Sequence, residues 1–216
     1  MEYILGIIIG YLLGCSNMAF YVSKFKKIDL RKEGSGNLGT SNTVTEIGLK
    51  AGLLVFFHDA FKAVIAILLI KLLYPNAQLA HYVTGVAVII GHIFPFYTKF
   101  KGGKGFASYI GMIYTLHPIF ALCATPIVIG LILFTDYMVV GTFSVAIGFM
   151  AFLFIIGKWE AGLLSLVVFA LMFIKHIENF KRIIAGTEKG VMEGLTKKKS
   201  KQNLDPTPTE NPNQEN

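Results

Sequence analysis

The sequence predicts an all-α membrane protein with about seven transmembrane helices, an N-terminus outside the cell and a C-terminus in the cytoplasm. Of its 216 residues, 54% are hydrophobic and only 15% are charged, and the mean hydropathy is +0.60. A soluble domain of this length is rarely so apolar. The apolar residues also gather in runs, and a helix of about 20 apolar residues crosses a hydrocarbon core of about 30 Å.

The apolar runs define the expected helices. They cover residues 3–23, 47–73, 79–97, 105–116, 118–134, 137–157 and 159–174. The fourth run, with about 12 residues, is too short to span a bilayer unaided and is expected to be re-entrant or packed inside the protein. No A-x-A cleavage pattern follows the first run, so we expect the first helix to be retained.

The distribution of basic residues predicts the orientation. Sixteen of the twenty Lys and Arg residues lie in segments 24–46, 98–104 and 175–216, which are the cytoplasmic segments if the N-terminus is outside. The turn at 135–136 is the exception, because its only charge is Asp136. The net charge of +7 suits topology and anionic lipids better than nucleic acid. We therefore expect the bilayer, and no nucleic acid, as a partner.

The chain is expected to form one membrane domain over residues 1–194. Residues 195–216 are polar and low in complexity, which predicts a disordered cytoplasmic tail. Cys15 and Cys123 both lie in apolar runs, so neither a disulfide framework nor a set of zinc ligands is expected.

A glycine-rich loop, KEGSGNLGTSN at residues 32–42, matches the dinucleotide fingerprint G-x-G-x-x-G. That fingerprint has meaning only inside a soluble βαβ unit, whereas this loop lies between two membrane runs. Its glycines allow several backbone N–H groups to converge on an anion. Four side chains add hydrogen-bond donors: Ser35, Asn37, Ser41 and Asn42. A flexible linker is the alternative interpretation.

A second polar segment covers residues 91–108. Lys101 and Lys104 flank two glycines, and Gly105 opens the next helix, whose N-terminus favours an anion. This arrangement suits a phosphate, although lysines at the ends of spans also anchor helices in the membrane. His92 lies in an apolar segment, where a histidine is more often a hydrogen-bonded structural residue than a catalyst.

A third polar segment, KHIENFKRIIAGTEKG, covers residues 175–190. On a helix, His176 shares a face with Asn179, and Glu178 shares a face with Arg182. A solvated helix end is the alternative. Charged residues also occur within the second run, in HDAFK at 58–62. Ionisable groups in a membrane span usually face partners or a cavity, and the spacing predicts a pair between Asp59 and Lys62.

Taken in this order, the strings KIDLRKEGSGNLGTSN, HDAFK, GHIFPFYTKFKGGKG and HIENFKRIIAGTEKG resemble the bacterial integral-membrane acyl-phosphate:glycerol-3-phosphate acyltransferases. The resemblance covers about residues 1–190. It implies seven membrane helices with the active site facing the cytoplasm of a bacterial cell. It also implies transfer of a fatty acyl group from acyl phosphate to the 1-hydroxyl of glycerol 3-phosphate. The products would be lysophosphatidic acid and phosphate, in the first step of phospholipid synthesis, with no cofactor or metal and a monomeric protein.

The resemblance also implies roles for individual residues. The catalytic residues would be Ser35, Lys104, His176 and Asn179. The phosphate-binding residues would be Gly34, Gly36, Asn37, Gly39, Ser41, Asn42, Lys101, Gly102 and Gly103. The supporting residues would be Asp59, Lys62, His92 and Glu188. Either His176 or the phosphate of the donor would accept the hydroxyl proton.

The chain departs from the family pattern at positions where the family has arginine. The matching positions hold Thr45, Asp136 and Ile177, and the first helix has Cys15-Ser16-Asn17 in place of a Ser-x-Pro turn. A divergent paralogue with another acceptor or low activity is therefore one alternative. A membrane transporter that binds an anion is another, although the spans show no pair of broken helices in inverted repeats.

Overall fold

The structure is a computed structural model that describes residues 1–191. The described chain is helical. Its elements are α1 (Glu2–Cys15), α2 (Met18–Lys26), α3 (Thr40–Glu46), α4 (Leu49–Leu73), α5 (Gln78–Ile93), the 3-10 helix η1 (Phe96–Thr98), α6 (Phe106–Leu116), α7 (Pro118–Thr135), α8 (Met138–Ile155) and α9 (Trp159–Ile184). The tail predicted for residues 195–216, and the end of the domain predicted at residue 194, lie outside the described residues.

The prediction of an all-α membrane protein is confirmed, with about six candidate spans and one shorter apolar helix at the position of the predicted fourth run. Within residues 1–191, six helical segments are long and apolar enough to cross a membrane: Glu2–Lys26, Leu49–Leu73, Gln78–Thr98, Pro118–Thr135, Met138–Ile155 and Trp159–Ile184. The short α6 is the exception. It packs against α4, α5 and α7, and its Tyr109 and Ser108 side chains are fully buried. The last helix also continues ten residues past the end predicted at 174, to Ile184.

The first span is broken in its middle. Helix α1 ends at Cys15 and α2 begins at Met18, where the side chain of Asn17 accepts a hydrogen bond from the backbone N–H of Phe20 at 2.9 Å. Lys62 on α4 donates to the carbonyl oxygens of Gly14 at 3.0 Å and Ser16 at 2.7 Å. Backbone groups left unpaired at membrane depth cost several kcal/mol each, so Lys62 stabilises the break.

The predicted pair between Asp59 and Lys62 is confirmed, with 3.0 Å between Asp59 Oδ1 and Lys62 Nζ. The pair also contacts other polar groups, on α4 itself and on its neighbours α5 and α6. Lys62 Nζ lies 2.8 Å from Nδ1 of His92 on α5, and Asp59 Oδ1 lies 3.2 Å from Nδ1 of His58. The backbone oxygen of Asp59 accepts from Ser108 on α6 at 2.9 Å. The two residues of this ion pair therefore connect α1, α4, α5 and α6, the last through the Asp59 backbone.

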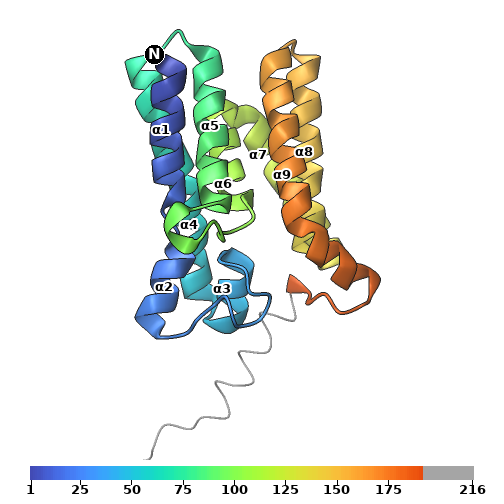
Figure 1. Ribbon diagram of the computed structural model, residues 1–216. Helices are drawn as coiled ribbons and strands as arrows, with labels where there is room; N and C mark the ends of the chain where they lie inside the picture. The colour runs from blue at the N-terminus through green and yellow to red at the C-terminus, as the bar shows by residue number, and fades with distance from the viewer. Residues whose placement is uncertain (192–216) are drawn as a thin grey trace, which may run out of the picture.

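The helices form two groups, visible side by side in Figure 1. Helices α1, α4, α5 and α6 pack together on one side, while α8 and α9 pack on the other and α7 contacts both α6 and α8. The loop from α2 to α3, the loop from η1 to α6 and the end of α9 all lie at the end of the bundle opposite the N-terminus (Figure 1). The three polar sequence segments are thereby brought to one end.

Helix α1 packs closely on α5 because glycines occur on the contact face, a common device in membrane helices. A Cβ on Gly14 would meet the Cα of Val88 at 2.8 Å. We expect Gly14→Ala to lower the free energy of unfolding by about 1–3 kcal/mol, the usual effect of overpacking. Thermal unfolding in detergent measures the change.

The control is Gly130→Ala, because a Cβ on Gly130 has no atom within 4 Å. Alanine favours a helix over glycine by about 0.5–1 kcal/mol, so this variant should be as stable as the wild type or slightly more stable. Equal stability of the two variants would contradict close packing at Gly14.

Candidate functional site

The loop at residues 27–39 has a defined structure held by buried side chains. Leu30 and Leu38 are almost completely buried and pack with Ala19 and Val55. The Asn42 side chain accepts from the backbone N–H of Ser35 at 2.9 Å and donates to the carbonyls of Leu30 at 3.0 Å and Glu33 at 3.1 Å. Both amide hydrogens of Asn42 are therefore used to brace the loop. These contacts are not those of a flexible linker.

The other polar residues of this loop lie nearer the surface. Ser35 and Ser41 are exposed, and Asn37 is partly buried. Gly34 and Gly36 have φ values of +56° and +70°, a left-handed conformation that glycine adopts without strain. The loop ends at Gly39, the residue that precedes α3. Because α3 begins at Thr40, Ser41 and Asn42 belong to a helix and not to the loop predicted for them.

The glycine turn at residues 102–103 folds back onto the end of α5. The N–H of Gly102 donates to Ile93 and that of Gly103 donates to His92, both at 3.1 Å. A Cβ on Gly103 would meet the His92 ring and would lie 2.9 Å from the Leu38 oxygen. Only glycine fits there, so the turn packs between α5 and the first loop.

Lys104 connects this turn to the end of α9. Its Nζ donates to Asn179 Oδ1, and Asn179 Nδ2 donates to Glu188 Oε1 at 2.6 Å. Glu188 in turn pairs with Arg182, with 2.5 Å between Oε2 and Nε. The structure therefore brings together Lys104, Asn179 and Glu188, three of the predicted site residues.

Glu178 and Arg182 both lie in α9, as their predicted shared face requires, but Arg182 pairs with Glu188. Glu178 pairs instead with Lys181 at 2.8 Å. Arg182 turns to Glu188 because the chain reverses after α9 at Gly186, whose φ is +66°, and returns Glu188 to the helix end. The three- and four-residue spacing of a helix does not predict a contact between a helix and the loop that follows it.

The charges around Lys104 affect its protonation. Burial, with the nearby charges of Arg182 and Lys175, lowers the pKa of the Lys104 ammonium to about 8, while Glu188 acts in the opposite direction. A half-buried cation surrounded by further cations is a favourable position for an anionic ligand. Lys101, by contrast, is exposed.

His176 lies beneath this network and is buried. Its Nδ1 is 2.7 Å from the carbonyl oxygen of Met172, so Nδ1 carries the proton and the lone pair is on Nε2. The ring packs edge-on against Phe143, with 5.4 Å between the ring centres. Within residues 1–191, no group of three or more His, Cys, Asp or Glu side chains could hold a metal ion.

Asn17 helps to hold the first loop in place, although the sequence predicted no role for it in the site. Its Nδ2 donates to the carbonyl of Leu38 at 3.3 Å, and its side chain is fully buried. It thus connects the break in the first span to the first loop. A polar residue inside an otherwise apolar run was the available signal.

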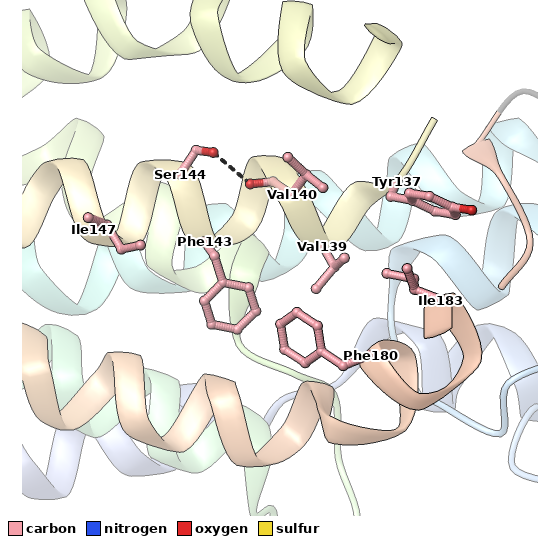
Figure 2. Close-up of a pocket in the computed structure, with 8 residues that line it drawn as sticks. All are labelled: Tyr137, Val139, Val140, Phe143, Ser144, Ile147, Phe180 and Ile183. Carbon is pink, nitrogen blue, oxygen red and sulfur yellow. Dashed lines mark hydrogen bonds between the residues drawn. The ribbon is translucent and has the colours of Figure 1, made fainter. Parts of the chain in front are cut away.

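An apolar pocket lies beside this network, between α8 and α9 (Figure 2). It has a volume of about 350 Å³ and is lined by Tyr137, Val139, Val140, Phe143, Ser144, Ile147, Phe180 and Ile183. Figure 2 shows the rings of Phe143 and Phe180 next to each other between the two helices, with 5.3 Å between the ring centres. The only polar interaction drawn, from Ser144 Oγ to the Val140 oxygen at 2.8 Å, stays within α8.

A cationic, glycine-lined site at one end of a membrane helix bundle, next to an apolar pocket, defines a membrane protein that handles an anionic amphiphile. Comparison with known proteins agrees. Residues 4–186 match the glycerol-3-phosphate acyltransferase family. The glycerol-3-phosphate acyltransferase of Thermoanaerobacter pseudethanolicus is 37% identical over 190 residues, which are 87% of this chain and 95% of that protein.

Two solved structures are also similar. The crystal structure of PlsY, an integral membrane glycerol 3-phosphate acyltransferase, in its glycerol 3-phosphate form has a TM-score of 0.83 and 32% identity, covering 91% of this chain and 100% of that chain. The lysophosphatidic acid form has a TM-score of 0.80 and 31% identity, covering 90% and 99%. The chain belongs to the glycerol-3-phosphate acyltransferase family and is an integral-membrane enzyme, which confirms the resemblance seen in the sequence.

The lowered pKa of Lys104 predicts a pH dependence. The ammonium is charged below its pKa of about 8 and loses its charge above it, so kcat/KM for glycerol 3-phosphate should fall as the pH rises through about 8. Glu188→Gln removes a negative charge that raises the pKa of Lys104, so the decrease in kcat/KM should occur at a lower pH in this variant. Initial rates between about pH 6.5 and 9.5 measure both profiles.

Glu178→Gln is the matched control, because Glu178 is exposed and pairs with Lys181 on the same helix. Its profile should coincide with that of the wild type. If kcat/KM decreases at the same pH in the wild type and in Glu188→Gln, the protonation of Lys104 does not control this decrease.

Proposed function

We propose that this acyltransferase takes its acyl group from an acyl phosphate and delivers it to the 1-hydroxyl of glycerol 3-phosphate. The products are lysophosphatidic acid and inorganic phosphate. The observation that carries the proposal is the position of Lys104, a half-buried cation beside a glycine turn and hydrogen-bonded to Asn179. Both substrates present a phosphate, and a cation beside backbone that permits close approach is suited to binding one.

Two neighbouring surfaces are available for the two phosphates. One is the first loop, where the side chains of Ser35 and Asn37 supply donors near the surface and Gly34 and Gly36 permit close approach of a ligand to the backbone. The other is the turn formed by Lys101, Gly102, Gly103 and Lys104. The two surfaces adjoin at Gly103, which packs near the Leu38 oxygen. Substrates bound in this way would have their reacting groups close together, which removes much of the entropic barrier to transfer.

In the proposed reaction the 1-hydroxyl oxygen attacks the acyl carbon and forms a tetrahedral intermediate. The bond from the acyl carbon to the phosphate oxygen then breaks, and phosphate leaves with the electron pair. Lys104 and Lys101 stabilise the negative charge on the phosphate as this bond breaks. The hydroxyl proton passes to the departing phosphate, whose second pKa is about 6, so no protein base is needed. His176 and Asn179 orient the substrates.

The acyl chain is placed in the apolar pocket between α8 and α9. Phe180 and Ile183, which line the pocket, alternate along α9 with Asn179 and Arg182, which belong to the polar network. A lipid with its phosphate in the network would therefore have its chain directed to the pocket. Burial of apolar chain contributes about 0.8 kcal/mol per methylene group.

The proposed setting is the cytoplasmic membrane of a bacterial cell, with the N-terminus outside and the active site facing the cytoplasm. Among residues 1–191, the basic segments 24–46, 98–104 and 175–191 support this orientation, because they lie at the end of the bundle opposite the N-terminus (Figure 1). The proposed form is a monomer with one domain over residues 1–194.

Purified protein incubated with acyl phosphate and glycerol 3-phosphate tests the proposal. Lysophosphatidic acid should form together with an equal amount of inorganic phosphate. An acyl thioester offered in place of the acyl phosphate should give no product. Product formed only from the thioester would show that the proposed donor is wrong.

Loss of the Lys104 charge should weaken transfer. We expect Lys104→Ala to lower kcat/KM at least about tenfold, because a hydrogen bond to a charged group contributes roughly 1.5 kcal/mol or more. Lys181→Ala, which removes an exposed lysine paired with Glu178, should retain wild-type kinetics. Equal kinetics of the two variants would exclude the role of Lys104.

Thr45 stands where the resemblance places an arginine. Its hydroxyl donates to the Ser41 oxygen at 3.1 Å within α3, and Lys50, the nearest substitute in the sequence, is a point charge and not a planar fork. We expect Thr45→Arg to lower the KM for glycerol 3-phosphate by about tenfold to a hundredfold. Steady-state kinetics at saturating donor measures it.

The divergence at Thr45 also bears on the choice of acceptor. A wild-type protein that is inactive with glycerol 3-phosphate but active with another hydroxylated acceptor would contradict the proposed acceptor. An unchanged KM in Thr45→Arg would instead show only that Thr45 does not occupy the position of that arginine.

A further inference from the structure

His92 lies between the buried ion pair and the glycine turn. It is in the last turn of α5 and is only 3% exposed. Its backbone oxygen accepts from Gly103, and its ring occupies the space that a Cβ on Gly103 would need, with Nε2 as the nearest atom. One edge of the ring therefore faces Lys62, and the other faces the turn that we assign to phosphate.

The contact with Lys62 determines which ring nitrogen carries the proton. Lys62 Nζ lies 2.8 Å from His92 Nδ1, and an ammonium group can only donate. Nδ1 must therefore accept, which leaves the proton on Nε2. Asp59 Oδ1 is 3.7 Å from Nδ1, too far for a hydrogen bond. Its closer contact, 3.0 Å to Lys62, holds the ammonium group in place.

The Nε2–H group of His92 has no partner among the residues that the structure describes. In the same part of the chain, no fully buried side-chain nitrogen or oxygen lacks a hydrogen bond. Nε2 is therefore not fully enclosed, although the ring as a whole is buried. It lies against Gly103 in the glycine turn, close to the Leu38 oxygen of the first loop. A buried donor with a fixed tautomer is thus aimed into the site.

We propose that His92 binds substrate directly, donating Nε2–H to a phosphate oxygen held at the turn of residues 102–104. Asp59 and Lys62 are positioning residues that fix the tautomer. This inference rests on the proposed binding of phosphate at that turn. In this arrangement Lys104 supplies positive charge to the phosphate, and His92 supplies a hydrogen-bond donor whose direction is fixed by its rigid ring. The ligand is a phosphate monoester or inorganic phosphate.

Two substitutions separate this role from a bracing role. His92→Asn keeps an acceptor near the position of Nδ1 for Lys62 but has no donor at the position of Nε2. His92→Gln reaches further and places an amide N–H near Nε2. His81→Asn is the control, because His81 is a buried histidine on the same helix, with Nε2 3.0 Å from the Tyr74 oxygen.

Affinities for glycerol 3-phosphate and for inorganic phosphate are measured separately by calorimetry in detergent. His92→Asn should bind at least one of them about ten- to a hundredfold more weakly than the wild type, the range for a hydrogen bond to a charged group. His92→Gln should stay within about threefold, and His81→Asn should be unchanged. The ligand that loses affinity identifies the phosphate that His92 contacts. Full affinity in His92→Asn, or equal losses in the Asn and Gln variants, overturns the proposal.

A measurement on the wild type does not depend on the variants folding. In protein labelled with ¹⁵N-histidine, His92 should have a protonated Nε2 and an unprotonated Nδ1, and the Nε2 signal should shift when glycerol 3-phosphate or phosphate is added. A proton on Nδ1, or a signal that neither ligand moves, overturns the proposal.

Lys104→Ala distinguishes failure of this inference from failure of the proposed function. If Lys104→Ala loses phosphate affinity while His92→Asn keeps it, the turn binds phosphate and only the role of His92 is wrong. If Lys104→Ala keeps full affinity for both ligands, phosphate does not bind at the turn, and both proposals fail.

Discussion

The structure depends on one buried ammonium group, that of Lys62. The first span is broken at its middle, and two of the carbonyl oxygens at the break are bound by Lys62 Nζ. A charge at this depth is unfavourable unless it is paired, and Asp59 is its counter-ion. The break and the ion pair therefore require each other. The break supplies acceptors for the cation, and the cation satisfies backbone groups that neither lipid nor helix can reach.

The functional loops take their positions from this contact. Asn17, immediately after the break, binds the Leu38 oxygen in the first loop. His92 accepts a hydrogen bond from Lys62. Its backbone oxygen accepts from Gly103 in the glycine turn, and its ring packs against the same glycine. Two loops far apart in the sequence are thus connected to Lys62. The first loop is connected through Asn17, which follows Ser16 in the break, and the glycine turn through His92. Groups fixed by packing and hydrogen bonding in this way lose little freedom when substrates bind.

The second group of helices contributes the remaining part of the site. Lys104, in the loop before α6, binds Asn179 on α9, and Lys189 lies 3.9 Å from Glu46, the last residue of α3. These polar contacts join the two groups at the same end of the bundle, next to the apolar pocket between α8 and α9. An enzyme whose product has a phosphate at one end and an acyl chain at the other needs this adjacency of polar and apolar surfaces.

The sequence by itself determined the membrane-spanning helical fold, the family, and the pair between Asp59 and Lys62. Each of these depends on composition, on motifs, or on residues three or four apart on one helix. Only the tertiary structure decided that α6 packs inside the bundle, that Arg182 pairs with Glu188 and not with Glu178, that Asn42 braces its own loop, and that Lys62 contacts His92. The contacts of Asn42 and Arg182 depend on how loops fold back on the chain, and those of α6 and Lys62 depend on how the helices pack, so the helical spacing of the sequence does not predict them.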